Sequence, residues 1–232
     1  MSLENLLVSA KSDTGANGNA LSKSTFTFNN PVVGTGVALN ADPTAIATTE
    51  ASLIIDVPSV ALQSSTAKAN TVLVKRIKLT CTAAGTAATK ARLAFYKDSI
   101  TRYSSGGSTL SGVATSASSS SSNIGVAQSS VYFGDLTALA ESSAGEEHIF
   151  TQLIKSDTTA APCFVIDDEF LFETLSEGKG GNNVYDSAGV CSSVFTMPMI
   201  YLKPGSSLLV KALFPNASAA ASFEVEVTLL EV

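Results

Sequence analysis

The sequence predicts an all-β fold, a two-sheet antiparallel β-sandwich with long Ser- and Gly-rich loops and little helix. Apolar residues alternate with polar ones at a period of two, which places successive side chains on opposite faces of a strand. Clusters of Gly, Pro, Asn and Ser separate these alternating runs. A helical period sustained over about ten or more residues is hard to find.

The chain begins with a weakly patterned segment at 1–23 that contains glycines and several asparagines. We expect an N-terminal arm or extended segment here, with a frayed terminus as the alternative. From 24 to 232 we expect a single β-sandwich domain, because all-β folds of about 200 to 250 residues often form one unit. Its first strand is predicted at 24–29, with Phe26 and Phe28 facing inward.

The middle of the chain contains the predicted strand with the clearest alternation, 76–82. Its apolar residues Ile77, Leu79 and Cys81 alternate with basic and hydroxyl residues, so they are expected to face the core. Shorter apolar runs predict further strands at 53–57, 91–96, 131–133 and 148–154.

A segment rich in Ser, Thr, Gly and Ala extends over about 104–130 and includes the serine run 118–122. It has too few apolar side chains to hold a core, so we expect a long exposed excursion. The excursion is either mobile or ordered against another subunit, and we favour the second because neutral polar residues are buried at little cost. A short helix is predicted at 135–142, with Asp135 as its N-cap.

The C-terminal part ends in a second clearly alternating strand, 223–229, with its apolar residues inward and two glutamates outward. In the segment 203–206, Pro204 and Gly205 occupy the adjacent positions that a type II turn prefers. We therefore predict a hairpin between the strands on either side of this turn. The other predicted strands of this part are 163–166, 169–173, 194–202 and 207–214.

The composition combines few charges with an acidic balance. Charged residues make up 15% of the chain and the formal net charge is −6. Binding of a phosphate backbone depends on many Lys and Arg, so no direct nucleic-acid contact is expected. The one basic cluster, Lys75, Arg76 and Lys78, is divided between two faces by the strand alternation. A surface of Ser, Thr, Ala and Asn suits subunit contacts; the alternative is a compositional habit of the source organism.

Targeting signals are not evident. The N-terminus lacks the basic leader and the apolar run of about 7 to 15 residues that mark a secretory signal. No window approaches the roughly 18 uninterrupted apolar residues of a membrane helix. We therefore expect a protein made in soluble form, without membrane insertion.

Residues for nucleophilic catalysis are sparse. His148 is the only histidine, and no GxSxG motif accompanies it. We expect an exposed or interface His at the start of a strand, and no enzyme. Cys81, Cys163 and Cys191 are odd in number and lack a CxxC pair, which favours buried thiols over a zinc site or a disulfide framework.

The densest acidic cluster is Asp167-Asp168-Glu169. Adjacent strand residues point to opposite faces, so the cluster is not expected to form an acid and base pair. We expect a turn with solvated carboxylates; cation binding is left open, although the EF-hand spacing is absent. The glycine-containing stretches 34–36 and 178–183 lack the Walker pattern and are interpreted as turns, the second as an exposed tip. No cofactor and no metal are predicted.

Long low-charge loops, an N-terminal arm and Ser/Thr/Ala-rich surfaces on a β-sandwich resemble viral coat proteins of the jelly-roll kind. They are also similar to the β-sandwich decoration proteins of bacteriophage heads. The resemblance is one of general character over the whole chain. It implies a structural capsid protein of the virion, made in the host cytoplasm, that forms symmetric homo-oligomers, often trimers, and contacts other capsid proteins. Each contact would bury more than about 1,000 Å².

A second hypothesis is a receptor- or carbohydrate-binding β-sandwich module of a virion spike or fibre. The loops at 104–130 and 178–189 would present its site. Carbohydrate sites use aromatic platforms, and the chain has no Trp. Tyr103, Tyr132 and Tyr185 are the tyrosines near these loops.

Overall fold

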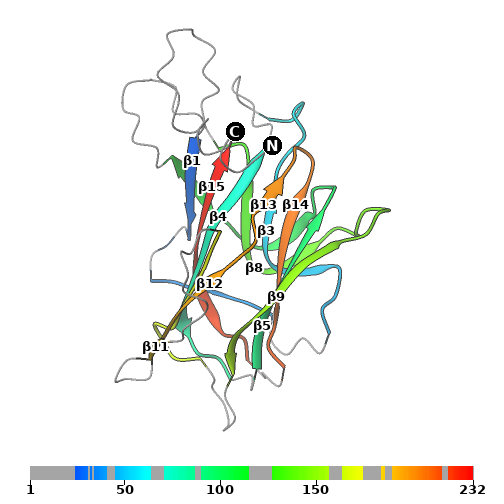
Figure 1. The fold of residues 1–232 in the computed structure, drawn as a ribbon. Helices are drawn as coiled ribbons and strands as arrows, with labels where there is room; N and C mark the ends of the chain where they lie inside the picture. Colours follow the sequence, from blue (N-terminus) through cyan, green and yellow to red (C-terminus); the bar gives the residue numbers. More distant parts are fainter. Residues whose placement is uncertain are drawn as a thin grey trace.

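The computed structural model describes residues 24–30, 32, 34–40, 45–63, 71–86, 90–114, 127–156, 164–174, 184–185, 190–215 and 219–231. Within these ranges the protein consists of strands, turns and irregular connections, without a helix. The strands form two sheets that pack against each other (Figure 1). The predicted arm at 1–23, the loop at 178–183 and Cys163 lie outside the described residues.

We refer to the two sheets as sheet A and sheet B. Sheet A contains β1 (Ser24–Asn29), β2 (Val37–Ala38), β4 (Val72–Ala83), β7 (Ser111–Ala114), β10 (Glu169–Glu173), β11 (Val184–Tyr185), β12 (Cys191–Thr196), β13 (Ile200–Leu202) and β15 (Ser222–Glu231). Sheet B contains β3 (Glu50–Asp56), β5 (Lys90–Asp98), β6 (Tyr103–Thr109), β8 (Ser130–Ala138), β9 (Glu147–Ser156) and β14 (Ser207–Leu213). The strand orders are β11-β12-β10-β4-β15-β1-β7 and β6-β8-β3-β14-β5-β9, and β2 and β13 pair with β15 and β4.

Eight of these strands have the connectivity of a jelly roll. In chain order they are β1, β3, β4, β5, β9, β10, β14 and β15. The first pairs with the eighth, the second with the seventh, the third with the sixth and the fourth with the fifth, always antiparallel, like one long hairpin rolled up. Pairing of β15 with β4 and of β14 with β5 then joins these pairs into the two sheets. The predicted antiparallel, jelly-roll-like β-sandwich is confirmed.

The main core lies between the sheets and consists of the inward residues of alternating strands. In β4, Ile77, Leu79 and Cys81 are buried and the residues between them are half-buried. In β15, burial alternates along the whole strand. Phe164 contacts Phe223 edge to face, with ring centroids 5.2 Å apart. The alternation predicted for 76–82 and 223–229 is therefore confirmed.

The chain between β5 and β9 adds three strands to the jelly roll. β8 pairs with β3, β6 pairs with β8, and β7 pairs with β1. The prediction of a long excursion at 104–130 is therefore wrong for its first part, which forms edge strands. Ser, Gly and Thr pair there through their backbones, and their exposed side chains need no core. Leu110 is buried where the chain passes from sheet B to sheet A. Residues 115–126 lie outside the described part.

The helix predicted at 135–142 is wrong. Residues 135–138 continue β8, and 139–142 are irregular. Along β8, Phe133 faces the main core and Leu136, three residues further on, faces the opposite side of sheet B, as the alternation of a strand requires. Pairing with strands on both sides therefore overrides the N-cap signal of Asp135.

Three predictions in the C-terminal part are corrected. Residues 164–168 form a turn, in which Asp167 has a positive φ of 72°, and not the strand predicted at 163–166. The strand at 194–202 is divided around Pro198, which has no N–H to pair; β12 runs beside β10, and β13 pairs with β4 beyond the end of β10. The turn at 203–206 forms, but its flanking strands belong to different sheets and make no hairpin.

Candidate functional site

The outer face of sheet B, opposite the main core, has a second buried cluster. In β3, Leu53 and Ile55 face the main core, whereas Ile54 faces outward and is nevertheless fully buried. It lies in a cluster with Leu209 of β14, against which Tyr96, Tyr103 and Tyr132 pack. The part of this face around Ile54 and Leu209 is therefore covered by other parts of the chain, whereas the paired residues Arg92 of β5 and Leu153 of β9 are exposed.

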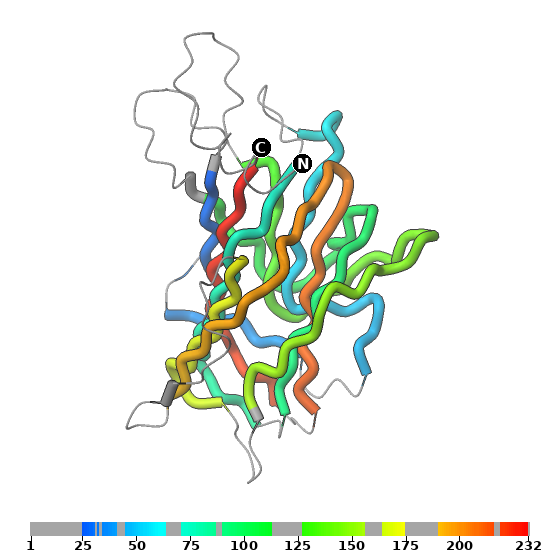
Figure 2. The backbone as a smooth tube through the Cα atoms, viewed as in Figure 1, coloured from blue at the N-terminus to red at the C-terminus, as the bar shows by residue number. Residues whose placement is uncertain are grey.

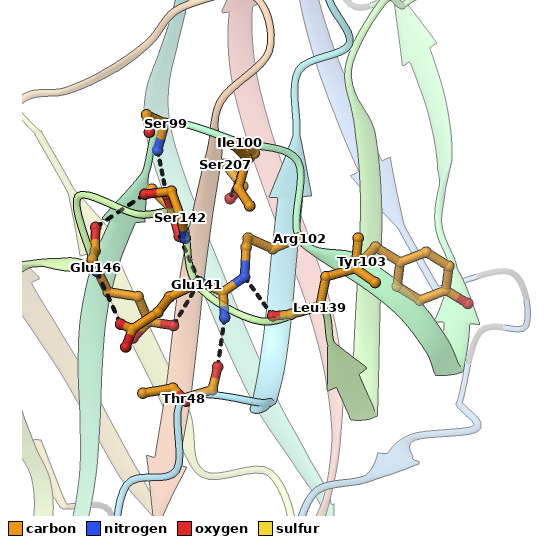
Figure 3. Close-up of polar contacts among 12 residues, drawn as sticks. Thr48, Ser99, Ile100, Arg102, Tyr103, Leu139, Glu141, Ser142, Glu146 and Ser207 are labelled. Atoms are coloured by element: carbon orange, nitrogen blue, oxygen red, sulfur yellow. Dashed lines mark hydrogen bonds and ion pairs between the residues drawn. The ribbon is translucent and has the colours of Figure 1, made fainter.

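Arg102 follows β5 and is the polar centre of this covered face (Figure 3). Its side chain has no exposed surface. Its Nε donates to the carbonyl oxygen of Leu139 at 2.7 Å, and its Nη2 donates to the carbonyl oxygen of Thr48 at 2.6 Å. Its backbone N–H donates to Oδ1 of Asp56 at 3.0 Å. One residue thus connects the segments before and after β3, after β5 and after β8.

Two carboxylates neutralise the guanidinium and extend the network to β14. Nη1 of Arg102 donates to Oδ2 of Asp98 at 2.7 Å and forms an ion pair with Oε1 of Glu146 at 2.9 Å. The other oxygen of Glu146 accepts from Nζ of Lys211 at 2.5 Å. Lys211 also lies over the ring of Tyr96, 4.7 Å from its centroid.

The network contains three carboxylates, those of Asp56, Asp98 and Glu146, and two cations. Burial raises the pKa of Asp56, against the lowering effect of the N–H groups and charge around it. Burial also acts on Asp98, but hydrogen bonds from Ser142, Arg102 and Ser99 prevail and lower its pKa. Burial lowers the pKa of Lys211, which Glu146 offsets only in part. The ionised network therefore depends on its internal hydrogen bonds.

A second buried ion pair joins the two sheets near the C-terminal end of β9. Nζ of Lys155, in β9, donates to Oδ2 of Asp168, and both side chains are buried. Asp168 also accepts the N–H of Cys191 at 2.7 Å and the N–H of Val165 at 2.7 Å. The register shift in β9 at Ile154 turns Lys155 inward.

These contacts correct the expectation of solvated carboxylates at 167–169. Asp167 is exposed, Asp168 is fully buried, and Glu169 forms an ion pair with Lys78 at 2.5 Å. Among the residues that the structure describes, no group of three or more His, Cys, Asp or Glu could hold a metal ion. The described part of the chain likewise has no helix that is long and apolar enough to cross a membrane.

The outer face of sheet A is half-exposed, and charged side chains on its neighbouring strands form ion pairs. Arg76 forms ion pairs with Glu173 at 3.7 Å and Glu226 at 3.2 Å. The predicted division of the basic cluster between two faces is wrong: a register shift at Lys75 leaves this residue exposed, and Arg76 and Lys78 are half-buried on the outward side of β4. A shallow hollow on this face is lined by Asn29, Asn30, Lys78, Thr80, Glu224, Val225 and Glu226.

The other candidate residues are dispersed over the molecule. His148 is exposed at the start of β9, as predicted, and its Nε2 lies 2.9 Å from Oγ1 of Thr151. Cys81 and Cys191 are buried, as predicted, in different strands of sheet A. The stretch 34–36 forms a turn, and a Cβ at Gly36 would lie 1.9 Å from Oγ1 of Thr82.

Two of the three tyrosines considered for a carbohydrate site come together. Tyr103 of β6 and Tyr132 of β8 are half-buried and stack with ring centroids 3.5 Å apart. Tyr185 belongs to β11, at the far edge of the other sheet. The stacked pair occupies one face of each ring, so any platform must use the remaining faces and edges.

The sequence prediction did not include Arg102, Glu146, Lys155 or Lys211. One signal was present, because Lys155 and Lys211 are cations inside apolar strand segments. A cation in such a position requires a buried partner, since an unpaired charge is costly to bury. No protein-family model, curated protein or solved structure matches the chain.

Proposed function

We propose that the chain is a structural protein of a virus particle, a capsid coat or decoration protein that assembles through subunit contacts. The observation that carries this proposal is the jelly-roll strand order, which is a recurrent architecture of viral capsid domains. Lectin domains and cupins share this architecture, so the fold needs support from the surfaces.

The sheet edges favour assembly through faces and loops. β6 has Gly106 and Gly107 at positive φ, which bends an otherwise exposed edge. β9 has two register shifts and turns Lys155 inward. Bulges and inward charges are devices that prevent edge-to-edge pairing. Strand addition between subunits is therefore disfavoured at both edges of sheet B.

The outer face of sheet A is the contact surface that the charges favour. Its half-buried cations on β4, Arg76 and Lys78, already have carboxylate partners on the neighbouring strands. Thr27, Thr80 and Thr228 lie between these pairs. A neighbouring subunit could cover such a face without leaving those cations unpaired, which is the costly case.

The test is native mass spectrometry and electron microscopy of the purified chain. The proposal expects discrete symmetric oligomers, or rings and shell-like lattices, at increasing protein concentration. A chain that stays monomeric at high concentration and does not bind isolated capsids would contradict it. Within this proposal, the acidic net charge of −6 favours the outer side of a shell over direct contact with the genome.

A second function is favoured by the stacked, half-buried Tyr103 and Tyr132, namely a receptor- or carbohydrate-binding module of a spike or fibre. Aromatic side chains with an apolar face and a polar tip suit sugar binding. A glycan array decides for this function if it gives hits that Tyr132→Ala removes. An array without hits, together with oligomers by native mass, decides for the assembly protein.

A further inference from the structure

The connection between β8 and β9 projects beyond sheet B (Figure 2). We refer to residues 139–146 as the projecting loop. Most of its residues are exposed, and the exposed fraction of Leu139 is 48%. Few hydrogen bonds form within the loop. Gly145 donates its N–H to the carbonyl oxygen of Ser142 at 2.8 Å, and Glu146 donates its N–H to a carboxylate oxygen of Glu141 at 3.2 Å.

The base of the projecting loop is fastened to the sandwich by polar contacts. Leu139 exchanges hydrogen bonds with Arg102, giving its N–H to the carbonyl oxygen at 2.6 Å and accepting from Nε. Ser142 donates its N–H to Oδ2 of Asp98 at 3.1 Å. Glu146 binds both Arg102 and Lys211. The contacts of Ser142 with Asp98 and of Glu146 with the two cations each depend on an ionised carboxylate.

We propose that the projecting loop is an electrostatic latch: it is closed while Asp98 and Glu146 are ionised, and acid opens it before the two sheets separate. The two sheets are held together mainly by the apolar core, whose burial does not depend on protonation, and their buried Lys155–Asp168 pair lies near the other end of β9 from the loop. The loop base loses its carboxylates on acidification and leaves Arg102 and Lys211 as buried, uncompensated cations. Opening would relieve that cost by giving both cations access to water.

The surrounding charges determine how the latch responds. Asp56 of β3, Glu141 of the loop, Lys211 of β14 and Tyr96 of β5 belong to the network or contact it. An open hollow of about 510 Å³ adjoins Asp98 and Glu146, and its charged lining residues are Lys97, Asp98, Glu146, Glu147 and Lys203. Glu50 lines a small neighbouring hollow with Lys211. The hollow at Asp98 and Glu146 offers a route by which water and protons can reach the latch.

Hydrogen bonds keep the pKa of Asp98 low. Its carboxylate therefore stays ionised, and keeps its hydrogen bond from Ser142, until the pH falls below the ordinary aspartate range. Asp56, whose pKa is raised by burial, takes up its proton earlier. The contact between Asp98 and Ser142 therefore persists at a pH at which Asp56 is already protonated.

The test follows hydrogen exchange at the amides of Leu139, Ser142, Gly145 and Glu146 by NMR, with protection corrected for the intrinsic effect of pH. In the wild-type chain, lowering the pH from 7 should reduce protection at these amides at a higher pH than at amides of β4 and β15. Loss of protection at the same pH in all of them would overturn the proposal.

Charge removal at neutral pH gives an independent arm. Glu146→Gln should lower protection of the Leu139 and Ser142 amides by about tenfold or more, while β4 and β15 stay unchanged. Glu147→Gln removes the same charge from the adjacent, exposed position and should behave as the wild type. Equal protection of the loop in both variants would also overturn the proposal, and the wild-type pH series decides if Glu146→Gln does not fold.

Discussion

At the scale of single residues, Arg102 has the largest consequence for the fold, because it is fully buried and bound to carboxylates from two elements. A buried ion pair adds little net stability over an apolar replacement, but removal of one partner leaves uncompensated charge. Removal of Arg102 alone leaves Asp98 and Glu146 in the protein. Their carboxylates would therefore remain buried without a guanidinium.

Arg102→Met should lower the free energy of unfolding by about 3–5 kcal/mol, because it leaves Asp98 and Glu146 without their shared cation. Urea denaturation at pH 7 measures the change. Arg92→Met is the matched control, since Arg92 is exposed in β5, and it should change the free energy by less than about 0.5 kcal/mol. Equal effects of the two substitutions would contradict the central role of Arg102.

The Asp98 carboxyl makes a definite contribution to the pH dependence. Its pKa is lowered from 3.8 in the folded protein, so the unfolded chain binds more protons between the two pKa values. The stabilisation by Asp98 is thus present above 3.8 and is lost as the pH falls through the folded pKa. Asp98→Asn should be less stable than the wild type at pH 7, and the difference should shrink toward pH 3.

Urea denaturation of both proteins at several pH values measures this difference. Asp56 has a raised pKa and acts in the opposite sense, but it is present in both proteins, so subtraction isolates Asp98. A difference that stays constant from pH 7 to pH 3 would show that the stabilisation by Asp98 does not depend on its charge.

At the scale of elements, the end of β15 is hydrogen-bonded to the segment just before β8. Glu231 is buried, and its carboxylate accepts the N–H groups of Gln128 at 2.9 Å and Ser129 at 2.8 Å. Charge-assisted bonds of this kind are stronger than neutral ones. The same strand pairs with β1 and β4, so Glu231 joins the added strands to the jelly roll.

Glu231→Gln should lower the free energy of unfolding by about 1–3 kcal/mol, because an amide oxygen replaces a charged acceptor of two backbone donors. Amide exchange at Gln128 and Ser129 should accelerate more than exchange in β5. Glu224→Gln is the control, since it removes a charge from a half-exposed position of the same strand. If both variants have the stability of the wild type, the carboxylate does not hold this junction.

The elements also show what the sequence could predict. Alternation was sufficient for β4, β10 and β15, because each has one face in the core and one face outside. It failed for β6, whose residues are mostly exposed and are held by backbone pairing alone. It also failed for the contacts of Asp168 and Arg102. Lys155 and Glu146 lie on other segments of the chain than their partners, and the i, i+4 spacing of Asp98 and Arg102 predicts a pair only within a helix.

At the scale of the whole molecule, the jelly roll presents two unlike outer faces. The face of sheet B is covered by its own chain around Ile54 and Arg102 and is exposed along β5 and β9. The face of sheet A is half-exposed, and its outward charges pair within the sheet. If copies of the chain assemble, the uncovered face of sheet A is the one available for a broad contact.

Thr80→Arg should therefore reduce self-association. Thr80 lies in the middle of β4 and lines the shallow hollow of the sheet A face. An arginine there fills the hollow and adds a bulky side chain that any contact covering the face would have to accommodate. Sedimentation or native mass spectrometry over a range of concentrations should show a shift to smaller species, while circular dichroism shows an unchanged fold. Lys97→Glu, a half-exposed position of sheet B, is the control; assembly that Lys97→Glu abolishes and Thr80→Arg leaves intact would place the contact on the opposite face.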